Sequence, residues 1–329
     1  MVLIKTDSIV DATIDNIAVA QQTNLEVFSG VLQLLAETDK DIIVVTSDSR
    51  GSGKLVPFGQ KFPDQIIEVG IAEQNLVGVS AGIASTGKKV FAVSPACFLT
   101  ARALEQIKND VAYSNNPVTL VGISAGVSYG ALGSTHHSLH DFAVLRTIHN
   151  LIIVAPADNF EAEQAVKLAA ETDLPVYIRF GKKSMPLLSA EKSFEFGKGR
   201  VIREGSDLTI IATGETVEHA CRAARKLERE HNLAATVVSM HTIKPLDYNL
   251  LSDIAAWDKP IITVEEHSVY GGLGEACASF LIQNNFRNRF KIIGIPDEYT
   301  VTGSQQEIFN HYGISEDGIT QTALALLGE

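Results

Sequence analysis

Short apolar runs alternate with longer amphipathic segments along the first half of the chain. Runs rich in Val and Ile predict strands at 41–48, 65–70, 88–95, 118–126, 151–158 and 175–180. They are continuous rather than alternating, which is typical of strands covered by helices on both faces. The segments between the runs predict helices at about 24–38, 71–86, 97–113 and 158–171. This order indicates a mostly parallel sheet with right-handed crossovers.

The first predicted helix has a candidate cap. Asn24 directly precedes the amphipathic run that ends at Thr38, and an Asn side chain can accept a hydrogen bond from a free N–H of the first turn. The residues before it, 1–24, are polar and mixed, so we expect a surface arm there.

The pattern breaks at 181–197 and then resumes, which indicates a linker between two domains. Further apolar runs predict strands at GRVIRE, LTIIATG, AATVVSM, PIITVEE and KIIGIP. Helices are expected from Glu215 to about His231 and near 303–311 and 316–327. The predicted fold is α/β, with an arm at 1–24, a parallel-sheet domain at 25–183, a linker at 184–196 and a smaller α/β domain at 197–329.

Composition narrows the classes of function. A length of 329 residues suits two domains, and the formal net charge of -12 has no Lys/Arg cluster to offset it. Nucleic acid and anionic membranes are therefore unexpected partners. Cys97, Cys221 and Cys277 lie far apart, without metal or disulfide spacing, and the N-terminus has no long apolar run. We expect reduced thiols and a cytoplasmic location.

The stretch IIEVGIAEQN, residues 66–75, places a carboxylate where a ligand could bind. A short apolar strand runs into a helix, and Glu73 lies in the first turn of that helix. Open α/β sheets keep their ligands at the carboxyl ends of strands. The alternative is that Glu73 only complements the helix dipole and faces water.

Three further strand ends carry candidate residues, each with a simpler alternative. Phe98 could offer a flat face to an aromatic ligand, or it could belong to the core. Arg179 could bind phosphate or carboxylate, or pair with a neighbouring acid. Arg50 and Ser52, in the run Ser47–Gly53, could contact an anion, or form a surface turn.

Residues 126–141 form a long Gly- and Ser-rich segment that predicts a functional loop. His136 and His140 could bind a metal, but no third ligand is obvious, so hydrogen bonding to a polar substrate fits the loop better. The glycines of Gly271-Gly-Leu-Gly274 are better explained by a close-packed turn than by a nucleotide site.

Taken in order, these stretches resemble the C-terminal part of transketolase and 1-deoxyxylulose-5-phosphate synthase, which are thiamine diphosphate enzymes. The matching stretches are EVGIAEQN, SPACFLTARALEQIKNDVAY, GSTHHSLHD, VYIRFGKK, EEHSVYGGLGEA and IPDEYTVTGSQQEIFNHYG. The resemblance covers about residues 25–329. It implies a pyrimidine-binding domain at 25–183 and the C-terminal domain of the family at 197–329.

The resemblance also implies roles for the candidates. Glu73 would bond a ring nitrogen of the aminopyrimidine of the cofactor, and Phe98 would stack on that ring. His136 would hydrogen-bond the substrate oxygen where charge develops. The implied reaction transfers a two-carbon ketol unit from a ketose phosphate to an aldose.

Substrate contacts follow from the same resemblance. Asp141 would orient a substrate hydroxyl, and Arg179 would bind phosphate with help from Arg50 and Ser52. The loop reads Thr135-His-His-Ser138, whereas full-length transketolases read closer to Thr-His-Gln-Pro. The sugar therefore stays open among pentose phosphates, apulose 4-phosphate and sulfonated sugars.

One element of the family is missing from the sequence. No Gly-Asp-Gly occurs, and the nearest match, Glu316-Asp-Gly318, lies in the wrong domain. The resemblance thus implies a split transketolase, in which an N-terminal subunit supplies the diphosphate site and its Mg²⁺. We expect an α2β2 assembly, no metal ligands in this chain and no activity of the chain alone.

Two alternatives stay open at this point. The beta subunit of the decarboxylating component of a 2-oxo acid dehydrogenase has the same two domains, although the Thr-His-His loop and Arg179 suit a phosphorylated polyol better. A non-catalytic regulatory subunit could keep the fold without the chemistry.

Overall fold

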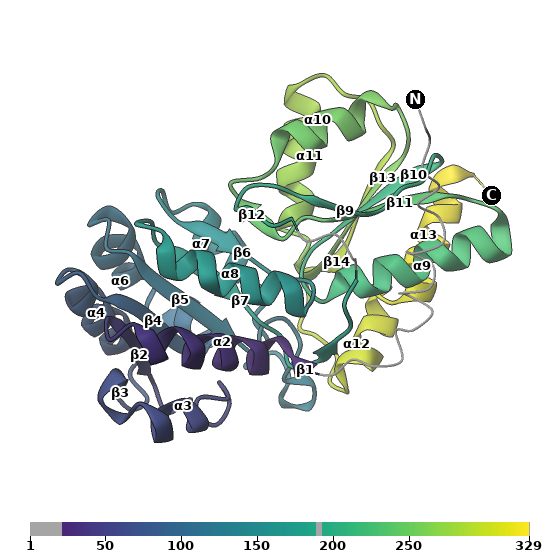
Figure 1. Cartoon of the computed structure of the whole chain (residues 1–329). Helices are drawn as coiled ribbons and strands as arrows, with labels where there is room; N and C mark the ends of the chain where they lie inside the picture. Colours follow the sequence, from purple (N-terminus) through teal and green to yellow (C-terminus); the bar gives the residue numbers. More distant parts are fainter. Residues whose placement is uncertain (1–21, 189–192, 329) are drawn as a thin grey trace.

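The first of two α/β domains is built on a seven-stranded sheet (Figure 1). The computed structural model describes residues 22–188 and 193–328. Strand order is β12-β6-β7-β5-β4-β2-β3, and all pairs are parallel except β12 with β6. The strands are β2 (Ile42–Thr46), β3 (Ile66–Glu68), β4 (Lys89–Pro95), β5 (Val118–Ile123), β6 (Ile152–Val154), β7 (Val176–Arg179) and β12 (Thr242–Lys244). The predicted parallel α/β fold is confirmed.

Helices cover both faces of this sheet, as the continuous apolar runs predicted. One face packs against α2 (Asn24–Thr38), α3 (Val56–Lys61) and α8 (Asn159–Glu171). The other packs against α4 (Glu73–Ala84), α5 (Ala96–Arg102), the π-helix at Ile107–Tyr113 and α7 (Asp141–Arg146). The sequence pattern did not predict α3 and α7, which are short helices of six residues each.

Two local expectations were wrong. The N-cap of α2 is Thr23, not Asn24, because Thr23 Oγ1 accepts from the N–H of Glu26 at 3.1 Å while the Glu26 carboxylate accepts from the N–H of Thr23 at 2.9 Å. The predicted helix at 97–113 is interrupted at Ala103, which separates α5 from α6 (Leu104–Gln106) and the following π-helix.

The second domain has a five-stranded sheet in the order β14-β13-β10-β11-β9. Only β9 runs antiparallel to its neighbour. The strands are β9 (Arg200–Arg203), β10 (Leu208–Ala212), β11 (Ala235–Ser239), β13 (Ile261–Ser268) and β14 (Phe290–Ile295). The helices are α9 (Thr216–His231), α10 (Tyr248–Ala256), α11 (Leu273–Gln283), α12 (Gln305–Tyr312) and α13 (Glu316–Leu327).

Strand pairing joins the two domains in a way that the sequence did not predict. The second domain supplies β12 to the edge of the first sheet, against β6. A separate two-stranded sheet pairs β1 (Gln22–Thr23), in the predicted arm, with β8 (Ser184–Met185), in the predicted linker. Most of the predicted arm, 1–21, and residues 189–192 of the linker lie outside the described residues. Within the described ranges, no helix is long and apolar enough to cross a membrane.

Candidate active site

The candidate residues meet at the carboxyl edge of the first sheet. Glu73 follows β3, Phe98 follows β4, His136 follows β5, and Arg179 ends β7. Because these strands are parallel, their carboxyl ends lie on the same edge. The topology therefore brings together side chains that are up to 106 positions apart (73 to 179) in the sequence.

Glu73 is the first residue of α4, and it is buried, with 4% of its surface exposed. Nη1 of Arg102 donates to both carboxylate oxygens, at 2.9 and 3.1 Å. Glu73 and Arg102 border an open hollow of about 490 Å³, together with Ile71, Gln74 and Asn75. A solvated carboxylate that only complements the helix dipole does not fit this burial.

Phe98 is half-buried and belongs to none of the core clusters among the described residues, and it contacts Arg102, which borders the hollow. The guanidinium carbon of Arg102 is 4.4 Å from the centroid of the Phe98 ring. The ring of His136 meets Phe98 edge to face, with 5.4 Å between the centroids. Arg102 thus links Glu73 to Phe98, and Phe98 links both to His136.

The loop after β5 separates its histidines into different environments. His136 packs edge to face on Tyr129 at 5.6 Å, and the ammonium of Lys182, an exposed residue, lies 4.4 Å from the centroid of the Tyr129 ring. His137 is buried, with Nδ1 2.6 Å from the hydroxyl of Thr300, and burial lowers its pKa. His136 thus contacts Phe98 in the site, whereas His137 links the loop to Thr300 of the second domain.

The structure brings no metal cluster to this loop. Nε2 of His140 lies 3.3 Å from the hydroxyl of Thr100, on α5. Across 22–188 and 193–328, no three His, Cys, Asp or Glu side chains are arranged to hold a metal ion.

Asp141 and Arg179 form a buried ion pair. Their side chains are 0% and 6% exposed, and Nε of Arg179 is 3.0 Å from Oδ2 of Asp141. The hydroxyl of Tyr177 donates to the same oxygen at 2.7 Å. Arg179 also donates to the carbonyl oxygen of Glu266 at 2.6 Å. Although burial opposes the charge of Arg179, Asp141 and Glu266 raise its pKa. Substrate contact by Asp141 and Arg179 stays a prediction, since each is turned toward the other here.

Arg50 and Ser52 lie in the loop after β2. Nε of Arg50 is 3.6 Å from Glu68, and Ser52 is exposed. The structure does not bring either residue into the contacts that join Glu73, Phe98 and His136. Their predicted help in phosphate binding is left as a prediction.

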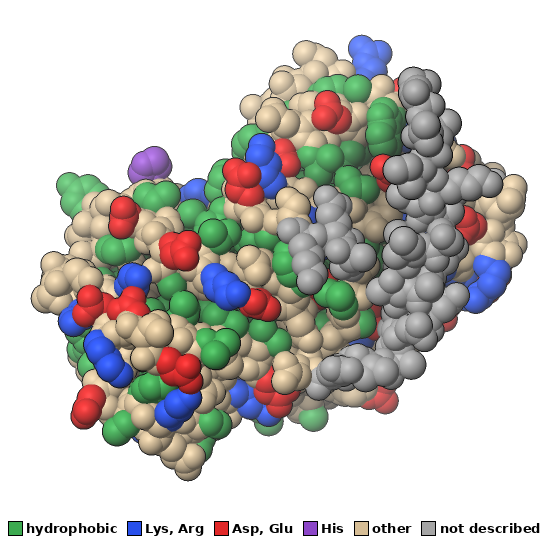
Figure 2. All heavy atoms as spheres, in the orientation of Figure 1, with side chains coloured by type: hydrophobic (Ala, Val, Ile, Leu, Met, Phe, Trp, Pro, Cys, Tyr) green, Lys and Arg blue, Asp and Glu red, His purple; other side chains and the backbone are tan. Residues whose placement is uncertain are grey.

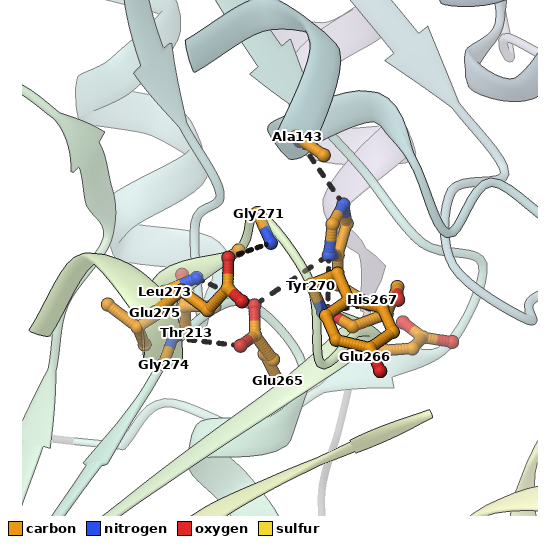
Figure 3. A network of polar contacts seen from close by, with 12 residues as sticks. Ala143, Thr213, Glu265, Glu266, His267, Tyr270, Gly271, Leu273, Gly274 and Glu275 are labelled. Atoms are coloured by element: carbon orange, nitrogen blue, oxygen red, sulfur yellow. Dashed lines mark hydrogen bonds and ion pairs between the residues drawn. The ribbon is translucent and has the colours of Figure 1, made fainter. Parts of the chain in front are cut away.

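A polar network beneath the site was missed at the sequence level (Figure 3). Two of its carboxylates, Glu265 and Glu266, come from β13, and Glu275 comes from α11. Glu265 accepts from the N–H groups of Leu273 and Gly274 at 2.7 and 2.8 Å, and burial raises its pKa to about 7. Burial, and then Glu215, raise the pKa of Glu266 to about 8. The sequence signal for this network was the pair of glutamates that ends the apolar run PIITVEE.

The same network contacts the loop at 126–141 that carries His136, His137 and His140, called the histidine loop below. Oε1 of Glu266 accepts from the N–H of Val127, within that loop, at 2.8 Å. His267 stacks on Phe142, with 5.0 Å between the ring centroids, and burial lowers its pKa to about 4. Nε2 of His267 faces the N–H of Ala143 at 3.4 Å (Figure 3). The second domain thus sets the position of the loop that carries His136.

Comparisons with known families cover nearly the whole chain. Residues 20–186 match the transketolase pyrimidine-binding domain, and residues 197–319 match the transketolase C-terminal domain. The chain is 50% identical over 299 residues to a protein of Phocaeicola vulgatus named as one subunit of apulose-4-phosphate transketolase, covering 90% of this chain and 95% of that protein. It is 39% identical to the protein of the same name from Actinobacillus succinogenes, with 87% and 92% covered.

A solved structure agrees with these sequence matches. The inactive beta4 tetramer of a split-gene transketolase superposes with a TM-score of 0.84 at 33% identity, covering 94% of this chain and 99% of that one. A transketolase from Pichia stipitis, at 22% identity and a TM-score of 0.78, shares the fold, and this chain covers 47% of its length.

Proposed function

Because this chain belongs to the transketolase family, we propose that it is the C-terminal subunit of a split, thiamine diphosphate-dependent transketolase. The observation that carries the proposal is the joining of buried Glu73 with Phe98 and His136 at the carboxyl edge of the first sheet. The similarity to proteins named as single subunits of a transketolase, over nearly their whole length, supports the split form.

The site fits the aminopyrimidine part of thiamine diphosphate. A flat cation, the guanidinium of Arg102, already bonds to Glu73 and covers the Phe98 ring, so the space accepts a planar group with N–H donors. Glu73 would hold the ring through a nitrogen, and Phe98 would stack on its face. When bound, thiamine diphosphate supplies the electron sink for breaking and forming the carbon–carbon bond of a sugar.

In this proposal, Glu73 and His136 have different roles in proton sharing and charge stabilisation. The carboxyl group of Glu73 would share a proton with the pyrimidine ring nitrogen. His136, half-buried at 5.4 Å from Phe98, would donate a hydrogen bond to the substrate oxygen where negative charge develops. Phosphate binding by Arg179 is part of the same proposal, with Arg50 and Ser52 as helpers and Asp141 on a substrate hydroxyl.

The second half of the site would come from another chain. No Gly-Asp-Gly occurs in the sequence, so we assign the diphosphate grip and Mg²⁺ to a partner subunit in an α2β2 assembly. Substrates would be sugar phosphates, since relatives at 50% and 39% identity carry the name of apulose-4-phosphate transketolase. Ketol transfer in carbohydrate metabolism, dependence on the partner and a cytoplasmic location belong to this proposal.

The comparisons favour this function over the two alternatives. The relatives named above are transketolase subunits rather than parts of a 2-oxo acid dehydrogenase. A regulatory subunit without chemistry would have no need to keep Glu73 buried beside an aromatic face.

The test is reconstitution. This chain is co-expressed with a partner that carries Gly-Asp-Gly, and ketol transfer is measured with thiamine diphosphate, Mg²⁺ and phosphorylated ketose and aldose pairs, apulose 4-phosphate included. We expect activity only with both subunits present, and its loss in Glu73→Ala. Glu171→Ala, which removes an exposed carboxylate at the opposite edge of the sheet, is the control. Full activity of this chain alone would contradict the split enzyme, and undiminished transfer by Glu73→Ala would contradict the site.

A further inference from the structure

Arg102 lies where the proposed function places the flat ring of the cofactor. It ends α5, and its Nη1 donates to both oxygens of Glu73, at 2.9 and 3.1 Å. The same guanidinium lies over Phe98, 4.4 Å from the ring centroid. One planar cation therefore uses the buried carboxylate and the aromatic face together.

A guanidinium and an aminopyrimidine compete for these two groups. Both are flat, both carry N–H donors in the plane, and both stack on aromatic rings. They would compete for the same positions, because Nη1 of Arg102 donates to both oxygens of Glu73 and the guanidinium lies over the Phe98 ring. A buried carboxylate without a donor is costly. Glu73 thus needs a substitute partner whenever the ring is absent.

Arg102 is free to leave this position. Its side chain is 50% exposed, whereas that of Glu73 is 5% exposed. The helix ends at Arg102, and the backbone turns at Ala103 before α6 begins. The guanidinium also borders the open hollow next to Ile71 and Asn75. Rotation of the side chain into this hollow would uncover Glu73 and Phe98 without moving α5.

Building on the proposed function, we propose that Arg102 is an internal placeholder for the aminopyrimidine ring. In the cofactor-free subunit it pairs with Glu73 and stacks on Phe98, and it leaves when the ring binds. The placeholder keeps Glu73 paired with a cation and Phe98 covered before assembly. Cofactor binding then competes with a ligand from the chain itself.

The competition should appear in the apparent dissociation constant of the cofactor. A ligand that binds only the open state has an apparent dissociation constant equal to the intrinsic one divided by the open fraction. If about one tenth of the molecules are open, removing the guanidinium tightens binding about tenfold. Arg102→Met keeps an unbranched stem without donors. Arg102→Lys keeps the charge but loses the planar fork, so an intermediate effect is expected.

The experiment uses the two-subunit assembly stripped of cofactor. Thiamine diphosphate is titrated at fixed Mg²⁺, with its affinity followed by calorimetry and its association rate by protein fluorescence. Arg102→Met should bind more tightly and faster than wild type. Arg287→Met, at an exposed position of the second domain, is the control and should match wild type. Weaker or unchanged binding by Arg102→Met overturns the placeholder. Failure of wild type and every variant to bind overturns the proposed function as well.

A measurement on the isolated chain covers the possibility that Arg102→Met folds poorly. Loss of the guanidinium leaves Glu73 buried without a donor, so the melting temperature should fall. Adding Glu73→Gln should recover most of the loss, because the remaining group is neutral. If the double variant is no more stable than Arg102→Met, the two side chains are not coupled and the placeholder is overturned.

Discussion

Arg179 and Asp141 form a buried ion pair next to the candidate site. Each is almost fully buried, and each has the other as its ionic partner at 3.0 Å. The pair also binds backbone and side-chain groups of neighbouring elements, through Tyr177, Ser138 and Glu266. A buried pair of this kind is costly to break from one side, because the remaining charge has no solvent. A structural role and a substrate-binding role of Arg179 therefore predict different effects of its removal on stability and on KM.

We expect Arg179→Met to lower the free energy of unfolding by about 3–5 kcal/mol, because Asp141 stays buried without its cation. Urea unfolding of the isolated chain measures this loss. Lys182→Met, which removes an exposed cation three positions away, is the control and should leave the midpoint unchanged. An unchanged midpoint for Arg179→Met, with a raised KM for the phosphorylated substrate, would instead identify Arg179 as a dedicated phosphate ligand.

The buried carboxyl of Glu266 gives a pH dependence with a definite sign. Burial, and then Glu215, raise its pKa from 4.5 to about 8. The unfolded chain loses this proton at lower pH than the folded chain, so stability falls as pH rises from about 4.5 to about 8. Glu266→Gln removes the titrating proton but keeps an oxygen for the N–H of Val127. The variant should gain stability relative to wild type across this window.

Thermal unfolding at pH 5, 6.5 and 8 measures the effect, and the stability advantage of Glu266→Gln over wild type should grow with pH. Glu275→Gln makes the same chemical change at an exposed position and serves as the control. A constant difference between Glu266→Gln and wild type at all three pH values would contradict the assignment of the proton to Glu266.

Among the elements, α7 and the turn before α11 are fitted to each other. Gly271 has φ of +74°, and a Cβ there would lie 2.5 Å from the Cβ of Ala143. Arg146 donates to the carbonyl oxygens of Gly271 and Gly272 across the same contact. The glycines of this turn thus serve close packing, as the sequence favoured. Because α7 follows the histidine loop, the turn also supports the site.

Gly271→Ala should therefore displace α7 and cost roughly 1–3 kcal/mol through overpacking. Ketol transfer by the two-subunit assembly should fall as well, since α7 follows the loop that carries His136. Gly87→Ala separates the two effects, because Gly87 also has a positive φ, +89°, but no atom within 4 Å of the added Cβ. Equal losses of stability in the two variants would show that backbone strain, and not the contact with α7, decides the outcome.

For the whole molecule, the hollow next to Glu73 is the part that the proposed partner would cover. Ile71, at its rim, is 74% exposed despite its apolar side chain. A partner that covers the hollow would remove this side chain from water, which favours association. On the face drawn in Figure 2, acidic and basic side chains are interspersed with hydrophobic ones. Because the proposed cofactor site lies at the carboxyl edge of the first sheet, we expect the partner to dock there.

Ile71→Asp should weaken assembly with the partner, about thirtyfold or more if Ile71 is a hot spot of about 2 kcal/mol. Sedimentation velocity at increasing partner concentration measures the shift, with α2β2 as the expected end state of wild type. Ile282→Asp is the matched control, because Ile282 is also 74% exposed but lies on α11. A wild-type mixture that stays monomeric at every ratio would contradict the proposed assembly.

The sequence by itself determined most strands and helices, and it singled out candidate site residues at the strand ends. Continuous apolar runs are a local property, so they predicted the parallel sheets, and ordered motifs singled out Glu73, Phe98 and His136. Short helices such as α3 and α7 escaped, because a run of six residues carries little periodic signal.

Only the tertiary structure decided which partner each charged side chain has. Arg179 faces Asp141, Glu266 reaches the histidine loop from the other domain, and Arg102 donates to Glu73. Such contacts depend on burial and on the packing of distant segments, neither of which is written in local sequence. The contact between Arg102 and Glu73, on which the proposed exchange rests, therefore appears only once the chain is folded.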